Sequence, residues 1–278
     1  MEYSKVLLSL HSKIKIMKKI IFTLLIINVL CSCSKTIDST ILTDANANPV
    51  TTPAASKPIT ITDSCVLYMP FNKDTKDYST YNNNGINYGT TLVPDRFGKD
   101  SSARKFTGTS YIQIASSPSI SFDSTFSLNS WINIPSYIDG INADQMRILS
   151  KERSAGGTGY AYGIDRTGLL VNSFNNDNTN FINNGTSVIP INTWTMVTFV
   201  YDGKTVKSYV NGVLKSQSTI TVTLLNSNLS LFIGKEFDDS HGGAGYTNRY
   251  FNGIIDDVRL YRKPLSDKDI NTLYNLKQ

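Results

Sequence analysis

Two tight turns lie close together in the segment 194–217, which reads WTMVTFVYDGKTVKSYVNGVLKSQ. Asp202-Gly203 and Asn211-Gly212 both suit hairpin loops, because Gly, Asn and Asp accept the positive backbone φ angles that such loops need. Asn211-Gly212 predicts a type I′ turn, and the first turn can extend to a three-residue loop. Apolar and polar residues alternate around both turns, with the period of two that is typical of strands. The segment therefore predicts an antiparallel meander.

The same pattern extends over residues 63–278. Short alternating segments, among them SYIQI, FSLNSWINI, GLLVNSF, LSLFIG and IIDDVRLY, are separated by clusters rich in Gly, Asn and Asp. No second linker interrupts them, so we expect one domain. Regular short strands between such turns predict an all-β sandwich or jelly roll.

The end of the chain predicts a short helix. Ser266 and Asp269 have the spacing of a capping box, and Ile270, Leu273 and Tyr274 share one face of the helix that follows. We expect this helix to pack on the edge of the sandwich.

The first 62 residues read as an export signal and a tether. From Met17 the chain runs MKKIIFTLLIINVLCSCSK, with a basic start and an apolar stretch too short to span a bilayer comfortably. Its end resembles a bacterial lipobox, in which Cys33 would be acylated after cleavage. We therefore expect residues 1–32 to be a signal peptide with its true start at Met17. Residues 33–62 would then be the lipidated Cys33 and a flexible linker; an ordinary signal peptide with incidental cysteines is the alternative.

Removal of the signal peptide changes the charge of the protein. The whole chain has a formal net charge of +5, and residues 1–32 contain one glutamate against five lysines. The mature protein would therefore keep only about +1, which predicts no nucleic-acid partner and membrane contact through the lipid alone. With Cys31 removed and Cys33 acylated, Cys65 would be unpaired, and its place in an alternating segment predicts a small buried residue.

Six segments in a fixed order carry a family resemblance. They are LYMPFNKDTKDYSTYNNNG, DRFGKDSSARKFTGTSYIQI, FSLNSWINIP, NTWTMVTFVYDGKTVKSYVNGVLK, LFIG and YFNGIIDDVRLYRKPLSDKDINTLY. Together they resemble the laminin G-like jelly-roll domains of the concanavalin A-like lectin/glucanase superfamily, over residues 64–278. The resemblance implies two curved antiparallel sheets stacked face to face, with Trp131 and Trp194 at core positions. Such domains are common in surface lipoproteins of Bacteroidetes-type bacteria, which implies an outer-membrane lipoprotein of the cell envelope.

The same superfamily contains laminarinase-type glycoside hydrolases. Their retaining mechanism needs two carboxylates, which Glu-x-Asp-x-Glu spacing on one strand supplies. That motif is absent here: the glutamates are Glu2, Glu152 and Glu236, and we expect the last two to lie far apart in loops. His241 is the one histidine left after cleavage, and the sequence contains no Gly-x-Ser-x-Gly motif with a nucleophilic serine that it could activate. We therefore predict no catalytic residues, and a hydrolase or lyase is the third hypothesis.

A structural calcium ion is the one cofactor that we consider. In related sandwiches an Asp of the last strand joins loop carbonyls around Ca²⁺, and the resemblance places Asp256 at that position. The alternative is that Asp256 pairs with Arg104 or Arg259. Asp257, the next residue along the strand, should point the other way and be solvated.

Two loops combine aromatic rings with polar side chains, the set that binds sugars. The first supplies the candidate ligand-binding residues Phe237, Asp238, Asp239, His241, Tyr246, Asn248, Arg249 and Tyr250. The second contains Phe174, Asn175, Asp177, Asn178 and Phe181, which we interpret as ordinary turn residues. The leading hypothesis is a non-catalytic surface lipoprotein that binds a glycan or a glycosylated partner. The alternative is a structural or adhesion module that binds protein.

The anchoring hypothesis predicts a change of location on mutation. Cys33→Ala should leave the membrane fraction, because the tether and the nearly neutral domain have no other predicted means of attachment. Cys65→Ala, at a cysteine outside the lipobox, should stay with the membranes. Cell fractionation and immunoblotting measure both, and a Cys33→Ala variant that remains in the membrane fraction would contradict the lipoprotein assignment.

Overall fold

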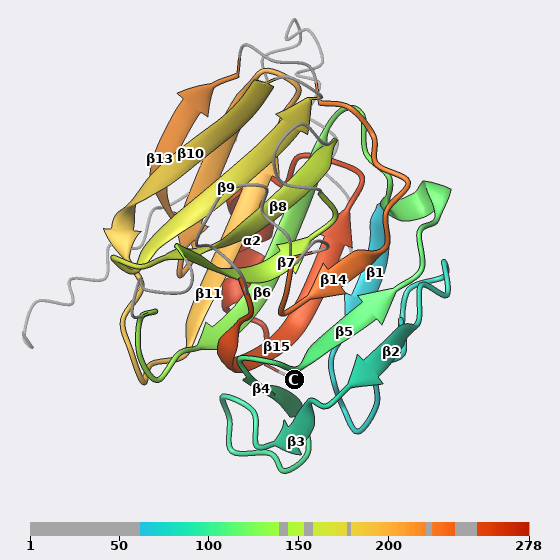
Figure 1. The fold of residues 1–278 in the computed structure, drawn as a ribbon, viewed down its shortest axis with the longest axis vertical. Coiled ribbons are helices and arrows are strands. Elements are labelled where there is room, and N and C mark those ends of the chain that lie inside the picture. The colour runs from blue at the N-terminus through green and yellow to red at the C-terminus, as the bar shows by residue number, and fades with distance from the viewer. Residues whose placement is uncertain are drawn as a thin grey trace, which may run out of the picture. The chain divides into compact units, whose positions relative to one another are not determined.

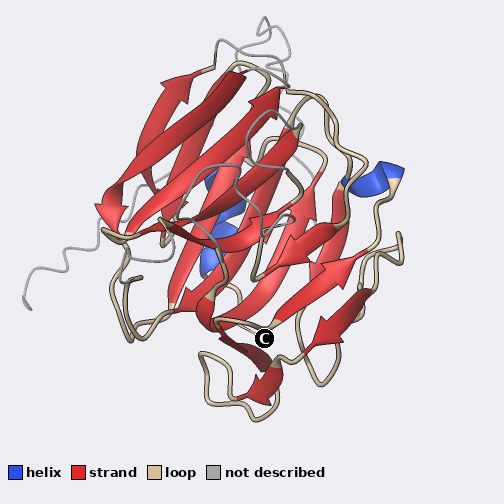
Figure 2. Ribbon diagram, in the orientation of Figure 1, coloured by secondary structure: helices blue, strands red, loops and turns tan. Residues whose placement is uncertain are grey.

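Two antiparallel sheets stack face to face in the computed structural model of the protein (Figures 1 and 2). The structure describes residues 62–138, 144–152, 158–176, 179–220, 224–236 and 249–277, with the backbone only for those of 174–186. These residues belong to one compact unit, Ser56–Gln278. The predicted all-β, jelly-roll fold of two sheets is confirmed.

Sheet A has eight described strands. Their order is β13 (Val213–Thr219), β12 (Thr205–Val210), β11 (Thr195–Tyr201), β6 (Phe126–Asn133), β15 (Asn252–Tyr261), β4 (Ala103–Thr107) and β3 (Thr91–Val93), and β1 (Cys65–Met69) also pairs with β15. Strand β15 therefore pairs with β6 along one side and with β4 and then β1 along the other.

Sheet B has seven described strands. Their order is β10 (Thr179–Val188), β9 (Leu169–Asn176), β8 (Gly159–Asp165), β7 (Gln145–Ser150), β14 (Leu231–Ile233), β5 (Tyr111–Ile114) and β2 (Gly85–Tyr88). A 3₁₀ turn, η1 (Pro118–Ile120), and one described α-helix, α2 (Asp267–Tyr274), complete the elements.

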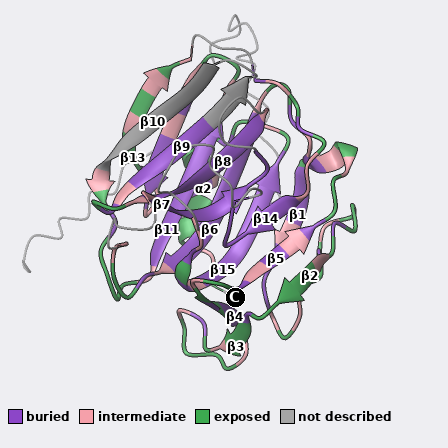
Figure 3. Ribbon diagram, viewed as in Figure 1, coloured by how far each residue is buried: buried purple, intermediate pink, exposed green. Residues whose placement is uncertain are grey.

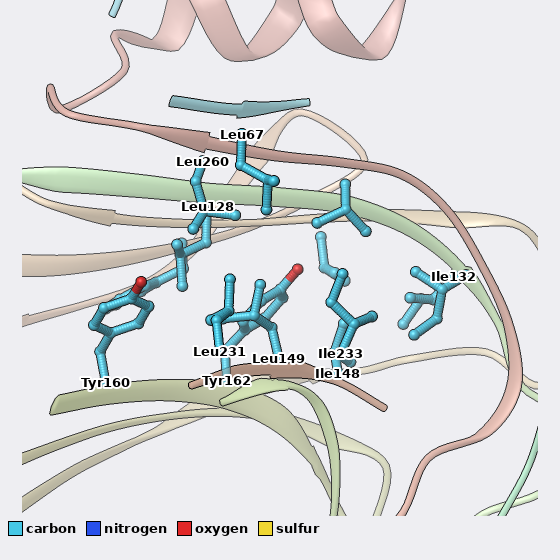
Figure 4. Close-up of a cluster of buried hydrophobic side chains, with 14 of the residues drawn as sticks. Leu67, Leu128, Ile132, Ile148, Leu149, Tyr160, Tyr162, Leu231, Ile233 and Leu260 are labelled. Atoms are coloured by element: carbon cyan, nitrogen blue, oxygen red, sulfur yellow. The ribbon is translucent and has the colours of Figure 1, made fainter. Parts of the chain in front are cut away.

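The main core fills the space between the two sheets. Leu128 and Leu260 reach into it from sheet A, and Tyr160, Tyr162 and Leu231 face them from sheet B (Figure 4). All five are at most 1% exposed. Because burial of a leucine-sized side chain stabilises a fold by about 1.5–3 kcal/mol, these facing side chains hold the sheets together.

A second cluster lies on the outer face of sheet A, under helix α2. The alternation along β11 produces both clusters: Val197 and Phe199 enter the main core, whereas Met196 and Val200 enter the second cluster. Trp131 also belongs to the second cluster, so it is buried as predicted, but beneath the helix and not between the sheets.

The predicted capping box at the start of α2 is confirmed. Ser266 Oγ accepts from the backbone N–H of Asp269, and the Asp269 carboxylate accepts from the Ser266 N–H. The predicted position of the helix was wrong, since α2 covers the outer face of sheet A and not the edge of the sandwich. The reason is the row of apolar side chains on that face, which the helix shields. Within the described residues, no helix combines the length and the apolar character needed to cross a bilayer.

Both predicted tryptophan positions pack against this helix-covered cluster. The ring of Trp131 stacks on Tyr274 of α2, with centroids 5.7 Å apart and 14° between the planes. Trp194 is only partly buried and packs against the same cluster. The prediction of a core position therefore holds fully for Trp131 and in part for Trp194.

The two turns of the opening segment differ in length. Asn211 and Gly212 have φ angles of 50° and 79°, and Val210 pairs with Val213 across them. This confirms the two-residue type I′ turn, which needs positive φ at both positions. The first turn is not the three-residue alternative, because Tyr201 pairs with Val206 and the Asp202 N–H donates to the Thr205 carbonyl at 3.2 Å. The Asp202 carboxylate accepts backbone N–H bonds from Lys204 at 3.0 Å and Thr205 at 2.7 Å.

Cys65 is a buried free thiol, as predicted. Burial raises the pKa of Cys65 to about 11, so the thiol stays protonated near neutral pH. A protonated, buried thiol behaves as a small apolar residue.

The positive φ of Gly212 predicts a specific sensitivity to side chains. Gly212→Val should destabilise the fold by about 1–3 kcal/mol, because a β-branched residue is strained in the left-handed region. Gly212→Asn should lower the free energy of unfolding by only a few tenths of the loss expected for Gly212→Val, because Asn accepts the left-handed backbone region. Chemical denaturation measures both variants, and a loss below ~0.5 kcal/mol for Gly212→Val would contradict the turn geometry.

Candidate functional site

Four aromatic residues gather on the outer face of sheet B, which is turned away from the main core. In β5 and β14, the residues next to Tyr111 and Phe232 along the strand belong to the main core. Successive side chains of a strand point to opposite faces, so Tyr111 and Phe232 face outward. Tyr88 of β2 lies opposite Tyr111 in the strand register. We call Tyr88, Tyr111, Phe232 and Tyr250 the aromatic platform.

The rings of the aromatic platform meet around Tyr111. Tyr88 stacks on it with centroids 4.6 Å apart and 16° between the planes. Phe232 meets it edge-on at 5.8 Å, and Tyr250 is tilted at 6.4 Å. Tyr88 is 41% exposed and Phe232 only 5%. Because β2 is the edge strand of sheet B and is largely exposed (Figure 3), the platform opens to solvent at that edge.

Lys235 closes the inner end of the platform. Its Nζ atom lies 4.7 Å from the ring centroid of Tyr111 and 5.3 Å from those of Phe232 and Tyr250. A cation in this position is attracted by the negative faces of the rings. The side chain reaches this place because Lys235 follows β14 by two residues, and the residue is only 8% exposed.

A network of ion pairs continues from the platform. Arg249 donates two hydrogen bonds to Asp144, from Nε at 2.7 Å and from Nη2 at 2.9 Å. Its Nη1 donates to Glu236 at 3.1 Å. Arg147 donates from Nη2 to Glu152 at 2.7 Å, and its Nε lies 3.5 Å from Glu236. We call these five residues the charge network.

The charge network holds together the ends of several chain segments. Four of its members border segments outside the described residues: Asp144 follows 139–143, Glu152 precedes 153–157, and Glu236 and Arg249 flank 237–248. Glu236 and Arg249 are themselves an ion pair. The segment that contains most of the predicted ligand-binding residues therefore starts and ends at two residues that bind each other.

The prediction that Glu152 and Glu236 lie far apart was wrong. Both contact the guanidinium of Arg147, a residue of β7. Burial raises the pKa of Glu152, and the Arg147 charge opposes that shift while Glu236 adds to it. Ser173 also donates to Glu152, at 2.8 Å. The two carboxylates are thus neighbours that arginine and serine side chains engage.

Most of the predicted ligand-binding residues cannot be placed by the structure. Phe237, Asp238, Asp239, His241, Tyr246 and Asn248 lie outside the described residues. Arg249 and Tyr250 are described: the first belongs to the charge network and the second to the aromatic platform. The interpretation of Phe174, Asn175 and Phe181 as turn residues was wrong, because their backbone belongs to strands β9 and β10. Asp177 and Asn178 lie outside the described residues, as do the side chains of those three residues.

The sequence analysis missed three residues of the platform. Tyr111 and Phe232 lie in segments that were predicted only as strands, and no element was predicted around Tyr88. One signal could have identified two of them, since Tyr111 in SYIQI and Phe232 in LSLFIG are large aromatics at the strand positions opposite to the apolar core face. Nothing in the sequence showed that β2, β5 and β14 are neighbours.

Asp256 and Asp257 lie in an arginine-rich cluster at a bulge of β15. Arg96 Nη1 is 3.0 Å from a carboxylate oxygen of each, and Arg259 Nη2 is 3.1 Å from Asp257 Oδ1. The prediction that Asp257 is solvated was wrong, because it is fully buried. Its φ of 55° and the register shift between Asp256 and Arg259 turn both carboxylates toward Arg96. The partner of Asp256 is thus Arg96, and not Arg104 or Arg259.

These residues fit a guanidinium better than they fit calcium. Asp256 Oδ1 is a buried oxygen with no hydrogen-bond partner, which would suit a metal ligand. The counter-charge, however, comes from Arg96, which is also held over the Trp131 ring at 4.5 Å. Burial, and then the Asp257 charge, raise the pKa of Asp256 to about 8 against the effect of Arg96. Within the described residues, no three His, Cys, Asp or Glu side chains form a metal-binding group. Calcium at Asp256 stays a prediction.

Comparison with known proteins places the fold. A family model described as the concanavalin A-like lectin/glucanases superfamily (laminin G type 3) matches residues 106–271, more than half of the chain. No curated protein matches the sequence.

Several solved toxin domains share the fold. The binding domain of Paraclostridial Mosquitocidal Protein 1 is 20% identical, with a TM-score of 0.62 over 78% of this chain and 53% of that one. The binding domain of Botulinum neurotoxin DC, solved with SialylT and also with rat synaptotagmin II, is 22% identical, with a TM-score of 0.59 over 78% and 52%. This chain thus spans about half the length of these solved structures.

The cluster at Asp256 predicts that an arginine, and not a metal ion, supplies the counter-charge. Arg96→Met should destabilise the fold by about 3–5 kcal/mol, because buried carboxylates would lose a partner. Arg166→Met, at an exposed arginine, should change stability by less than about 0.5 kcal/mol. Denaturation curves measure both.

The same cluster predicts that EDTA leaves the melting temperature of the wild-type protein unchanged. A metal that binds only the folded state would instead stabilise it, by about 2.7 kcal/mol at a hundredfold excess over Kd. The calcium hypothesis predicts the opposite result, namely a melting temperature that falls in EDTA, recovers with Ca²⁺ but not Mg²⁺, and loses this response in Asp256→Ala.

Proposed function

We propose that this chain, which belongs to the concanavalin A-like lectin/glucanase superfamily, is a non-catalytic module that binds glycans through its aromatic platform. The observation that carries the proposal is the exposed Tyr88–Tyr111 stack at the open edge of sheet B. Sugars bind aromatic rings through their C–H faces, and amides nearby serve the hydroxyl groups. Gln113 of the adjacent strand position supplies such an amide, held by Ser230 at 3.2 Å.

The solved structures of the same fold support a binding role. They are described as binding domains, and one of them is solved in complex with SialylT. Their low identity to this chain means that the ligand cannot be transferred residue by residue. The role of a binding module is the part of the likeness that we adopt.

The cellular setting is part of the proposal. The lipobox at Cys33 and the linker 33–62 would attach the module to the outer membrane, with the glycan-binding edge free to contact polysaccharide or glycoprotein. A tether rich in Thr, Ser and Pro suits this role, because it gives reach without folding.

Two other functions have an observation in their favour. Ile86, Leu92 and Phe97 are exposed apolar side chains, which suits a protein partner, and one toxin domain of this fold is solved with rat synaptotagmin II. The neighbouring Glu152 and Glu236 suit a glycoside hydrolase. We rank both below glycan binding, because the glutamates are engaged by arginines and the aromatic stack is exposed.

The platform predicts which tyrosines contribute to binding. Tyr88→Ala and Tyr111→Ala should each weaken glycan binding by about tenfold, equivalent to about 1.4 kcal/mol, because each removes a stacking surface. Tyr81→Ala, at a tyrosine 49% exposed outside the platform, should bind like the wild type. A glycan array followed by titration of the strongest ligand measures this. Equal binding by all three variants would contradict the platform as the site.

A further inference from the structure

The platform and the charge network together define what kind of glycan can bind. We propose that the ligand is an uncharged, extended polysaccharide, and not a sialylated or uronic acid-containing glycan. This inference rests on the proposed function and adds the chemical class of the ligand.

The arginines beside the platform are already engaged. An acidic sugar is usually held by an arginine fork or a lysine, which pairs with its carboxylate. The guanidinium of Arg249 donates hydrogen bonds to Asp144 from Nε and Nη2, and its Nη1 donates to Glu236. Arg147 lies between Glu152 and Glu236 and is 2% exposed. An anionic ligand would have to displace these buried carboxylates from their partners.

Lys235 is also poorly placed to bind an anion from solvent. Three platform rings surround its Nζ at 4.7–5.3 Å, and the residue is only 8% exposed. The charge network contains three carboxylates and two arginines, which gives it a formal charge of −1. The positive charge of Lys235 therefore brings the formal charge of these described residues to zero. The region therefore offers an acidic sugar no excess positive charge.

Among the described residues, the exposed part of the site contains no ionisable acid or base besides tyrosine. From Ser79 to Pro94, a stretch that includes all of β2, the sequence has no Asp, Glu, Lys, Arg or His, and the same is true of β5 and β14. The polar groups there are amides and hydroxyls, such as Gln113, whose side-chain amide donates to Ser230 Oγ at 3.2 Å. Such groups match sugar hydroxyls, which are neutral.

The shape of the site favours a chain and not a single terminal sugar. The platform runs across strands β2, β5 and β14, from the exposed Tyr88 to Tyr250. At its outer end β2 has no further strand beside it, and Ile86 on the same strand is 60% exposed. A polysaccharide can therefore lie against the exposed Tyr88 and continue past the edge of the sheet.

The test compares polysaccharides that differ only in charge. Full-length protein in detergent is run on native gels that contain polygalacturonate or its carboxyl-reduced, neutral product, and sialylated or desialylated mucin glycan. Neutral β-glucan, mannan and xylan complete the panel. We expect at least one neutral polymer to retard the protein, with an affinity that changes less than about twofold between low and high salt.

Two variants separate the possible outcomes. Tyr88→Ala should bind the neutral polymer about tenfold more weakly than the wild type, whereas Tyr81→Ala should bind it with unchanged affinity. Tyr88-dependent binding that prefers the acidic member of a pair, or weakens about tenfold in high salt, would overturn this inference and leave the proposed function intact. No retardation by any polymer, or binding that ignores Tyr88, would overturn the proposed function and this inference with it.

Discussion

The ion pairs around Arg147 and Arg249 impose the constraint on which the outer face of sheet B depends. Buried charges are costly unless they are paired, and here two arginines bind three carboxylates from distant parts of the sequence. These pairs join the residues that border three chain segments. They also bring Arg249 to sheet B, and thereby place its neighbour Tyr250 against the platform. Removal of Arg147 would deprive two buried glutamates of an ion-pair partner.

The same pairing shapes what the site can bind. Charged side chains that already pair with one another bind a charged ligand only weakly. The exposed surface beside them consists of aromatic rings, amides and hydroxyls. The site therefore separates two tasks. The charge network gives the segment ends their position, and the neutral platform provides the contact surface. An uncharged polysaccharide is the ligand that fits this division.

Much of the fold could be predicted from the sequence because its signals are local. The Asn211-Gly212 turn, the alternation along β11 and the Ser266–Asp269 capping box each depend on a few adjacent residues, and the structure confirms them. The site was harder to predict, since it depends on which strands are neighbours. Arg147 of β7 contacts both Glu152 and Glu236, and no local pattern shows those contacts.

Asp257 shows a second reason why a prediction from the sequence was wrong. The rule that adjacent strand residues face opposite ways holds only for regular strands, and a positive φ at Asp257 breaks it. A bulge leaves almost no trace in a single sequence, because Asp accepts a left-handed backbone without a diagnostic neighbour. The expectation that Asp257 is solvated was built on that regular geometry, whereas the calcium hypothesis for Asp256 came from the family resemblance and is still to be tested.

The central claim is that a neutral sugar chain lies on the Tyr88–Tyr111–Tyr250 surface. Tyrosine ring signals in NMR spectra, followed during titration with a neutral oligosaccharide cut from the polymer that binds, test it most directly. The account predicts that the signals of Tyr88, Tyr111 and Tyr250 shift, while those of Tyr78, Tyr81 and Tyr274 stay in place. Saturable binding that leaves the three platform tyrosines unshifted would contradict it.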